Sequence, residues 1–295
     1  MKLNKIYTAI FIISAALFLY RLYWLFKSFS PKHLVFNTLP YILQNLVTLC
    51  GLAGVIVFGA TKFKRTALLS LYFIIEIVLM PVSALYYYTI FSNPVSRYGS
   101  LFYLSLLLEI IFLTTACTGV ALFTKQKQIK LHYIFIGSEP IAEFVPALKW
   151  KRFINYLTDT LLIIYALYGL TNMMRWVAAI SERPYSYHRP AALSQLMPLF
   201  FYFLYYLVLE AIFKTTAGKA LTNTMIVNTR GKTAGILQMI GRTFCRFVPF
   251  DGLSFLKADG RGWHDSFTDT YIVDAIVSEE PLQTADPGDL LSGYI

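Results

Sequence analysis

Five ionisable side chains lie inside long apolar runs of this sequence, and they are the first candidates for chemistry. They are Arg21, Glu76, Glu109, Asp159 and Glu210. A charge surrounded by hydrocarbon needs a partner, a water-filled path or a neutral protonation state, so such residues are rare and their positions carry information. How far each one lies from the end of its apolar run decides what it can do.

Glu76 and Glu109 lie about ten residues into their runs, which is roughly 15 Å at 1.5 Å per helical residue. Two carboxylates at one level in a low-dielectric medium do not both ionise easily, so they share a proton or bind a cation. Because neither has an obvious basic partner, we predict a proton or sodium site here. Two alternatives stay open: each acid is protonated and hydrogen-bonded to a hydroxyl group, or Arg21 neutralises one of them.

Asp159 and Glu210 lie near the ends of their runs, close in depth to Arg152, Lys214 and Lys219. We therefore expect a charged cluster at the inner membrane interface. Arg242, Arg246 and Asp265 join it if the segment that carries them packs beneath. A clasp of ion pairs that fixes the helices to the C-terminal segment is favoured over a substrate site.

The spacing of the residues does not favour a metal site, a nucleotide-binding loop or a catalytic nucleophile. The sequence before Gly218 and Lys219 lacks the glycine-rich spacing of a phosphate loop. The four histidines are scattered, and His264 beside Asp265 has no third ligand near it in sequence. The cysteines, at positions 50, 117 and 245, form no pair or Cys/His cluster. We predict that the chain is not an enzyme, with no catalytic residue, no metal site and no cofactor.

The elements that position these residues are membrane-spanning helices. Of the 295 residues, 57% are hydrophobic and 14% charged, against roughly 25% charged in soluble domains. The segments long enough to cross a bilayer are 6–26, 39–61, 66–91, 100–124, 153–174 and 193–213. We predict an all-α integral membrane protein with about six transmembrane helices, an interfacial amphipathic helix and a small cytoplasmic C-terminal segment.

The distribution of Lys and Arg orients the helices. Most of them fall in alternate connections, which places both termini in the cytoplasm by the positive-inside rule. An uncleaved first helix is favoured over a signal peptide, because no small-residue cleavage site follows the first apolar run. The net charge of +10 then reflects topology and anionic lipid headgroups rather than nucleic acid. We expect a multi-pass membrane protein with a basic cytoplasmic side.

The segment 234–256 permits two interpretations. A seventh span would bury Arg242, Arg246 and Asp251, each at a cost of at least about 2.5–3.5 kcal/mol near the bilayer centre. An in-plane amphipathic helix instead places both arginines at the headgroups while its apolar side chains enter the acyl region. We favour the interfacial helix, with Ile236, Met239, Ile240, Phe244 and Phe247 as the immersed side chains.

The chain divides into four predicted parts. Residues 1–124 form a four-helix transmembrane region, and 125–150 form a cytoplasmic linker. Residues 151–275 form a second membrane unit, and 276–295 form an acidic tail without periodicity, which is typical of disorder.

The second unit resembles the RDD family of bacterial membrane proteins. The residues that carry the resemblance are Arg152 and Asp159; Glu210; Thr216, Ala217, Gly218 and Lys219, followed by the β-like run 223–227; Arg242 and Arg246; and Gly262, Trp263, His264 and Asp265, with Thr270 and Val273 after them. The resemblance covers about 145 residues from Arg152 onward and leaves the first four helices outside it. It implies a multi-pass protein of the bacterial cytoplasmic (inner) membrane, for which transport of ions or small solutes is the usual suggestion.

Two functions follow as alternatives. The first is transport of a proton, sodium ion or small solute, with Glu76 and Glu109 as the ion site. The second is a non-transporting scaffold or accessory factor that recruits a partner at the cytoplasmic face, as a homo-oligomer or with another membrane protein. A membrane-embedded enzyme that acts on lipid is a weaker third alternative, since only the presence of acids supports it.

Overall fold

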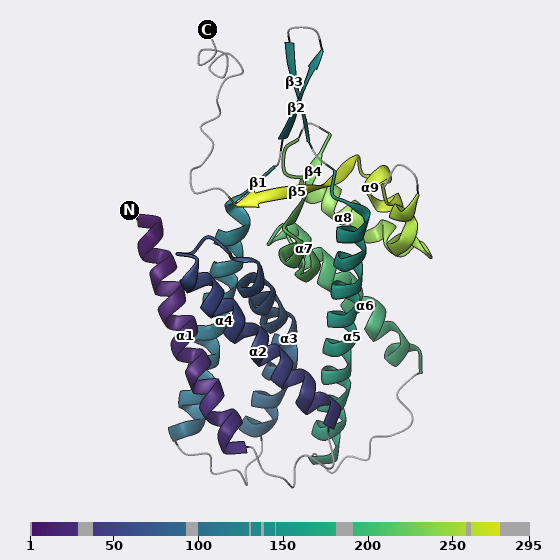
Figure 1. Cartoon of the computed structure of the whole chain (residues 1–295). Coiled ribbons are helices and arrows are strands. Elements are labelled where there is room, and N and C mark those ends of the chain that lie inside the picture. The colour runs from purple at the N-terminus through teal and green to yellow at the C-terminus, as the bar shows by residue number, and fades with distance from the viewer. Residues whose placement is uncertain are drawn as a thin grey trace.

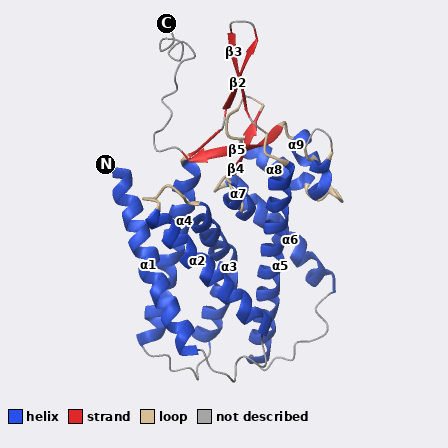
Figure 2. Cartoon of the chain, in the orientation of Figure 1, coloured by secondary structure: helices blue, strands red, loops and turns tan. Residues whose placement is uncertain are grey.

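The computed structural model is a helical bundle with a small set of strands at one end (Figures 1 and 2). It is mostly helical, in agreement with the composition. The described residues are 2–28, 38–92, 100–129, 131–136, 139–144, 146–180, 191–229, 231–257 and 261–277.

The first four helices pack around an aromatic core. They are α1 (Lys2–Ser28), α2 (Thr38–Ala60), α3 (Ala67–Ser92) and α4 (Ser100–Lys125). Phe123 lies 5.3 Å from Phe58 and 6.2 Å from Phe73 between ring centroids, and all three are buried. Gly54 lets α2 approach the α3 backbone closely, because a Cβ there would lie 2.9 Å from the Leu69 nitrogen. Small residues serve helix packing in membranes in this way.

Two further long helices, α5 (Lys149–Ile180) and α6 (Ala191–Ala211), stand beside this group. Helix α3 packs against α5 and against the short helix α7 (Ala217–Thr222), so the first four helices and the second unit are in contact. Four helices in the described part of the chain are long and apolar enough to cross a membrane. These stretches are Lys5–Leu22, Ala67–Tyr88, Tyr103–Lys125 and Lys149–Arg175, with shorter apolar stretches at Leu46–Ala60 and Leu196–Ala211.

The prediction of an all-α chain needs correction at the end where the strands gather. An antiparallel sheet in the order β1-β5-β4 contains Lys127–Ile129, Thr270–Val277 and Thr224–Asn228. Strands β2 (Leu131–Ile136) and β3 (Glu139–Phe144) form a hairpin that stands away from the bundle (Figure 1). The sequence of β5 is rich in β-branched residues, which favour a pleated strand, and only the run overlapping β4 was predicted.

The remaining elements are short and lie between β4 and β5. They are α8 (Ile236–Cys245), the 3₁₀ helix η1 (Asp251–Leu256) and α9 (Trp263–Phe267). With 10 residues, α8 is about 15 Å long, too short for a hydrocarbon core of about 30 Å. A seventh span over 234–256 is therefore excluded. The predicted tail 276–295 overlaps the last two residues of β5, and its remainder lies outside the described residues.

Candidate functional site

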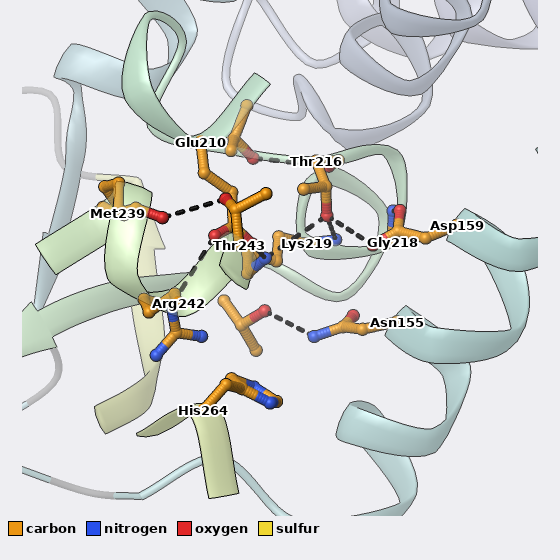
Figure 3. A network of polar contacts seen from close by, with 12 residues as sticks. Asn155, Asp159, Glu210, Thr216, Gly218, Lys219, Met239, Arg242, Thr243 and His264 are labelled. Atoms are coloured by element: carbon orange, nitrogen blue, oxygen red, sulfur yellow. Dashed lines mark hydrogen bonds and ion pairs between the residues drawn. The ribbon is translucent and has the colours of Figure 1, made fainter. Parts of the chain in front are cut away.

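The signature residues of the second unit form a buried ion-pair network, which we call the signature network. It is centred on two acids, Glu210 at the end of α6 and Asp265 in α9, both 0% exposed. Figure 3 shows how α5, α6, α7, α8 and α9 each direct side chains into it. Its members are Arg152, Asp159, Glu210, Gly218, Lys219, Arg242, Arg246, His264 and Asp265.

Glu210 forms ion pairs with three cationic side chains. Its Oε1 lies 2.7 Å from Lys219 Nζ and 2.7 Å from Arg246 Nη2, and its Oε2 lies 3.6 Å from Arg242 Nε. The guanidinium of Arg246 also stacks on Tyr206, with Cζ 3.9 Å from the ring centroid. A buried carboxylate stays ionised only with such partners.

Asp265 is the second acidic centre. It forms ion pairs with Arg152 and Arg242, and its Oδ2 accepts a hydrogen bond from the Gly262 amide at 3.2 Å. Burial alone would raise the pKa of Asp265, but the neighbouring positive charges, led by Arg242, outweigh it and hold the pKa far below its usual range. Arg242 thus bridges both acids and ties α8 to α6 and α9.

Asp159 is bound by uncharged donors instead. It accepts hydrogen bonds from the Tyr205 hydroxyl at 2.7 Å, the Thr216 hydroxyl at 2.8 Å and the Gly218 amide at 2.8 Å. The amide reaches α5 because Gly218 has no side chain; a Cβ there would lie 2.4 Å from Asn155 Cα. Thr216 also caps α7, since its Oγ1 accepts from the Lys219 amide.

Asp251 belongs to the site although no pattern in the sequence pointed to it. Its Oδ2 lies 2.6 Å from His264 Nδ1, and its Oδ1 accepts from the His264 amide at 2.9 Å. Burial lowers the pKa of His264. Burial would raise the pKa of Asp251, but the bonds from His264 lower it overall. Trp263, the remaining signature residue, is only partly buried and lies against Lys257, whose Nζ is 5.1 Å from a Trp263 ring centroid.

Lys127 is a second residue of the site that was not predicted from the sequence. It lies in β1, within the predicted linker, and is buried. Its Nζ donates to the carbonyls of Lys219 at 3.1 Å and Thr224 at 3.3 Å. Burial, and then the like charge of Lys219, lowers the pKa of Lys127 to about 7. Nothing in its sequence neighbourhood signals this, because only the pairing of β1 with β5 brings it inward.

Replacing Lys127 by methionine is expected to flatten the pH dependence of stability. Between pH 7 and 10.5 the unfolded chain holds this proton while the folded chain does not. The wild-type free energy of unfolding therefore rises with pH in this window, by up to about 1.4 kcal/mol per pH unit from this group. Denaturant unfolding in detergent from pH 7 to 9.5 measures the slope of the free energy of unfolding against pH. The control is Lys125→Met, which removes the amino group of an exposed lysine. Equal slopes in wild type and Lys127→Met would contradict the assignment.

Helix α8 differs from the prediction in the positions of its two arginines and of Met239. Arg242 and Arg246 were expected at the headgroups, but they face the protein interior because Glu210 and Asp265 attract them there. Met239, expected in the acyl region, is buried against Ile226 and Ala234. The exposed face is apolar, with Ile236, Leu237 at 84% exposure and Phe244.

Glu76 and Glu109 do have a basic partner, so the expectation of acids without one was wrong, and the alternative that involves Arg21 agrees with the structure. Arg21 forms ion pairs with both: Nη1 contacts Glu76, and Nη2 lies 3.3 Å from both Glu109 oxygens. Arg21 Nη1 also donates to the Tyr72 hydroxyl at 3.0 Å. A cavity of about 120 Å³ adjoins the two acids. We call Arg21, Glu76 and Glu109 the intramembrane triad.

The predicted site residues thus form two separate clusters. The intramembrane triad lies within α1, α3 and α4, and the signature network lies around α5 to α9. Within the described part of the chain, no cluster of three or more His, Cys, Asp or Glu side chains is arranged to hold a metal ion.

Comparison with known proteins gives one match. Residues 146–278 match the model of the RDD family, which confirms the resemblance noted in the sequence and leaves the first four helices outside it. Neither the curated proteins nor the solved structures contain a match.

Proposed function

We propose that this chain, whose residues 146–278 match the RDD family of membrane proteins, carries a proton or another monovalent cation across the membrane at the intramembrane triad. The supporting observation is the charge of the triad. Two carboxylates share one guanidinium, which stays protonated in proteins, so the group has one acid in excess when both ionise. A proton or bound cation supplies the missing positive charge.

Glu109 is the exchangeable member of the triad in this proposal. Glu76 is the more deeply buried acid, with 8% of its side chain exposed, whereas Glu109 keeps 31%. Both line the 120 Å³ cavity, together with Ser83 and Tyr87. The cavity gives a proton or a partly hydrated cation an approach to Glu109, while Glu76 stays paired with Arg21.

The proposal places six helices across the inner membrane, with both termini in the cytoplasm. The lengths of α2 and α6, 23 and 21 residues, support this count, since about 20 residues suffice to span. The excess of Lys and Arg at the end of the bundle that carries the strands supports the orientation. Labelling of a single cysteine placed at Lys125 by an impermeant reagent from outside would contradict it.

Glu109→Gln is expected to abolish cation flux while leaving the protein folded. The variant removes the exchangeable carboxyl but keeps the Arg21–Glu76 pair, so no buried charge is left alone. Purified protein in proteoliposomes with a trapped pH-sensitive dye measures flux under proton, sodium or potassium gradients. We expect a loss of at least tenfold, against no change in Asp269→Asn, which removes an exposed carboxyl far from the triad.

Two outcomes would remove the proposal. One is wild-type protein that raises flux no more than empty liposomes under every gradient. The other is a Glu109→Gln variant that transports at the wild-type rate, since the triad then has no part in the movement of the ion.

A further inference from the structure

A small, half-enclosed cavity of about 30 Å³ adjoins the signature network. Arg152, Lys219 and Arg246 line it from three different helices or turns, and His264 and Asp159 complete its polar wall. Asn155, Asp159, Lys219 and His264 can be followed around this region in Figure 3. Gly252 and Phe255 of η1 close one side.

The charges of the network are distributed unevenly around the cavity. Glu210 and Asp265, which pair with the cations, do not line it. The wall therefore carries three cations and one carboxylate, Asp159. That carboxylate is already held by a tyrosine hydroxyl, a threonine hydroxyl and a backbone amide. The cavity therefore presents guanidinium and ammonium groups to whatever enters it, while Glu210 and Asp265 lie behind the wall.

One N–H group of Arg246 has no hydrogen-bond acceptor among the described residues. Its Nη2 binds Glu210, and the group in question is its buried Nε. A buried donor without an acceptor destabilises the folded protein, and an oxyanion in the cavity would accept its hydrogen bond. Guanidinium groups match the oxygens of phosphate better than any other side chain.

The size and surroundings of the cavity limit the kinds of ligand that it can bind. A volume of 30 Å³ has room for roughly two or three water molecules, or for one small oxyanion. Its η1 wall also carries Leu253 and Leu256 on the outer side, exposed at 40% and 56%, next to Phe250 at 80%. An anionic group in the cavity therefore lies beside an apolar surface suited to acyl chains.

We propose that this cavity is a binding site for a phosphate oxyanion, either free inorganic phosphate or the phosphodiester of an anionic phospholipid in the inner leaflet. Arg152, Lys219 and Arg246 bind the oxygens, and η1 forms the rim. Arg242, which bridges Glu210 and Asp265 behind the wall, holds the two acids away from the ligand. The site is independent of the intramembrane triad and of cation movement.

Thermal unfolding of the full chain in a neutral detergent tests the proposal in three arms. The additions are sodium phosphate against sodium chloride at equal ionic strength, short-chain phosphatidylglycerol, and short-chain phosphatidylcholine. Stabilisation by phosphate identifies a free oxyanion site, and stabilisation by phosphatidylglycerol but neither other addition identifies a lipid site. No selective stabilisation in the phosphate and phosphatidylglycerol arms would overturn the proposal.

Two variants assign the effect to the cavity. Arg246→Lys keeps a charge for Glu210 but loses the guanidinium donors, and we expect the apparent Kd for the stabilising addition to rise at least tenfold. Arg152→Lys serves the same purpose should Arg246→Lys fail to fold. Lys257→Gln, which removes an exposed cation near α9, is expected to change Kd less than twofold. An unchanged Kd in the folded arginine variants, or an equal loss in Lys257→Gln, would place the binding elsewhere.

Discussion

Asp265→Asn is expected to lower the free energy of unfolding by about 3–5 kcal/mol, the cost of breaking a buried ion pair by removing one partner. Asp265 is fully buried between Arg152 and Arg242. Asparagine preserves the shape, so the loss arises from two guanidinium groups that keep their charge without their counter-ion. Because His264 and the Gly262 amide contact the same carboxylate, α9 loses its anchor as well.

Equilibrium unfolding in detergent, followed by tryptophan fluorescence, measures this loss. Trp263 lies two residues before Asp265 in α9, so its fluorescence reports the release of this helix. The matched control is Asp269→Asn, which also removes one carboxyl charge. Asp269 is exposed and has a φ of 50°, a conformation that asparagine adopts readily, so a change of at most about 0.5 kcal/mol is expected. A similar small change in Asp265→Asn would show that the signature network does not fasten the C-terminal elements.

The sequence predicts the existence of the charge clusters better than their geometry. Asp159 and Glu210 lie within apolar runs, and the high cost of unpaired charge there requires partners. Depth along a helix says nothing about which way the helix faces, however. The pairing of Arg21 with Glu76 and Glu109, from three different helices, therefore could not be read from spacing alone.

The same limit explains why the arginines of α8 face the protein interior and not the headgroups. Its sequence is amphipathic, and an amphipathic pattern near a membrane predicts cations at the headgroups. The pattern does not reveal that Glu210 and Asp265 lie behind the helix, and attraction to these buried acids outweighs exposure to water. Lys127 was missed for another reason, since its burial depends on β1 pairing with a strand about 150 residues away, and such long-range pairing leaves no local signal.

Helix α3 connects the two predicted sites physically. It carries Glu76 of the intramembrane triad and packs against α5 and α7, which carry Asp159 and Lys219 of the signature network. The first four helices are therefore not a separate attachment. A displacement of α7 relative to α5 also changes the packing of α7 against α3.

Gly218→Ala is expected to destabilise the protein by about 1–3 kcal/mol or more, the range for overpacking in a tight core. The added Cβ would lie 2.4 Å from Asn155 Cα and 2.5 Å from the Asn155 carbonyl oxygen. Both are backbone atoms of α5, which has no rotamer to change, so α7 must move instead. That movement breaks the 2.8 Å bond from the Gly218 amide to Asp159 and displaces Lys219 from Glu210.

The control is Gly169→Ala in α5, where the nearest atom to the new Cβ is a Val82 methyl at 3.4 Å. Ordinary van der Waals contact, together with the higher helix propensity of alanine, predicts no loss and a gain of at most about 1 kcal/mol. Thermal unfolding of both variants in the same detergent gives the comparison. Equal stability of Gly218→Ala and wild type would mean that α7 does not lie against α5 as closely as the structure has it. The signature network would then lose the contact that aligns Asp159 and Lys219 with their partners.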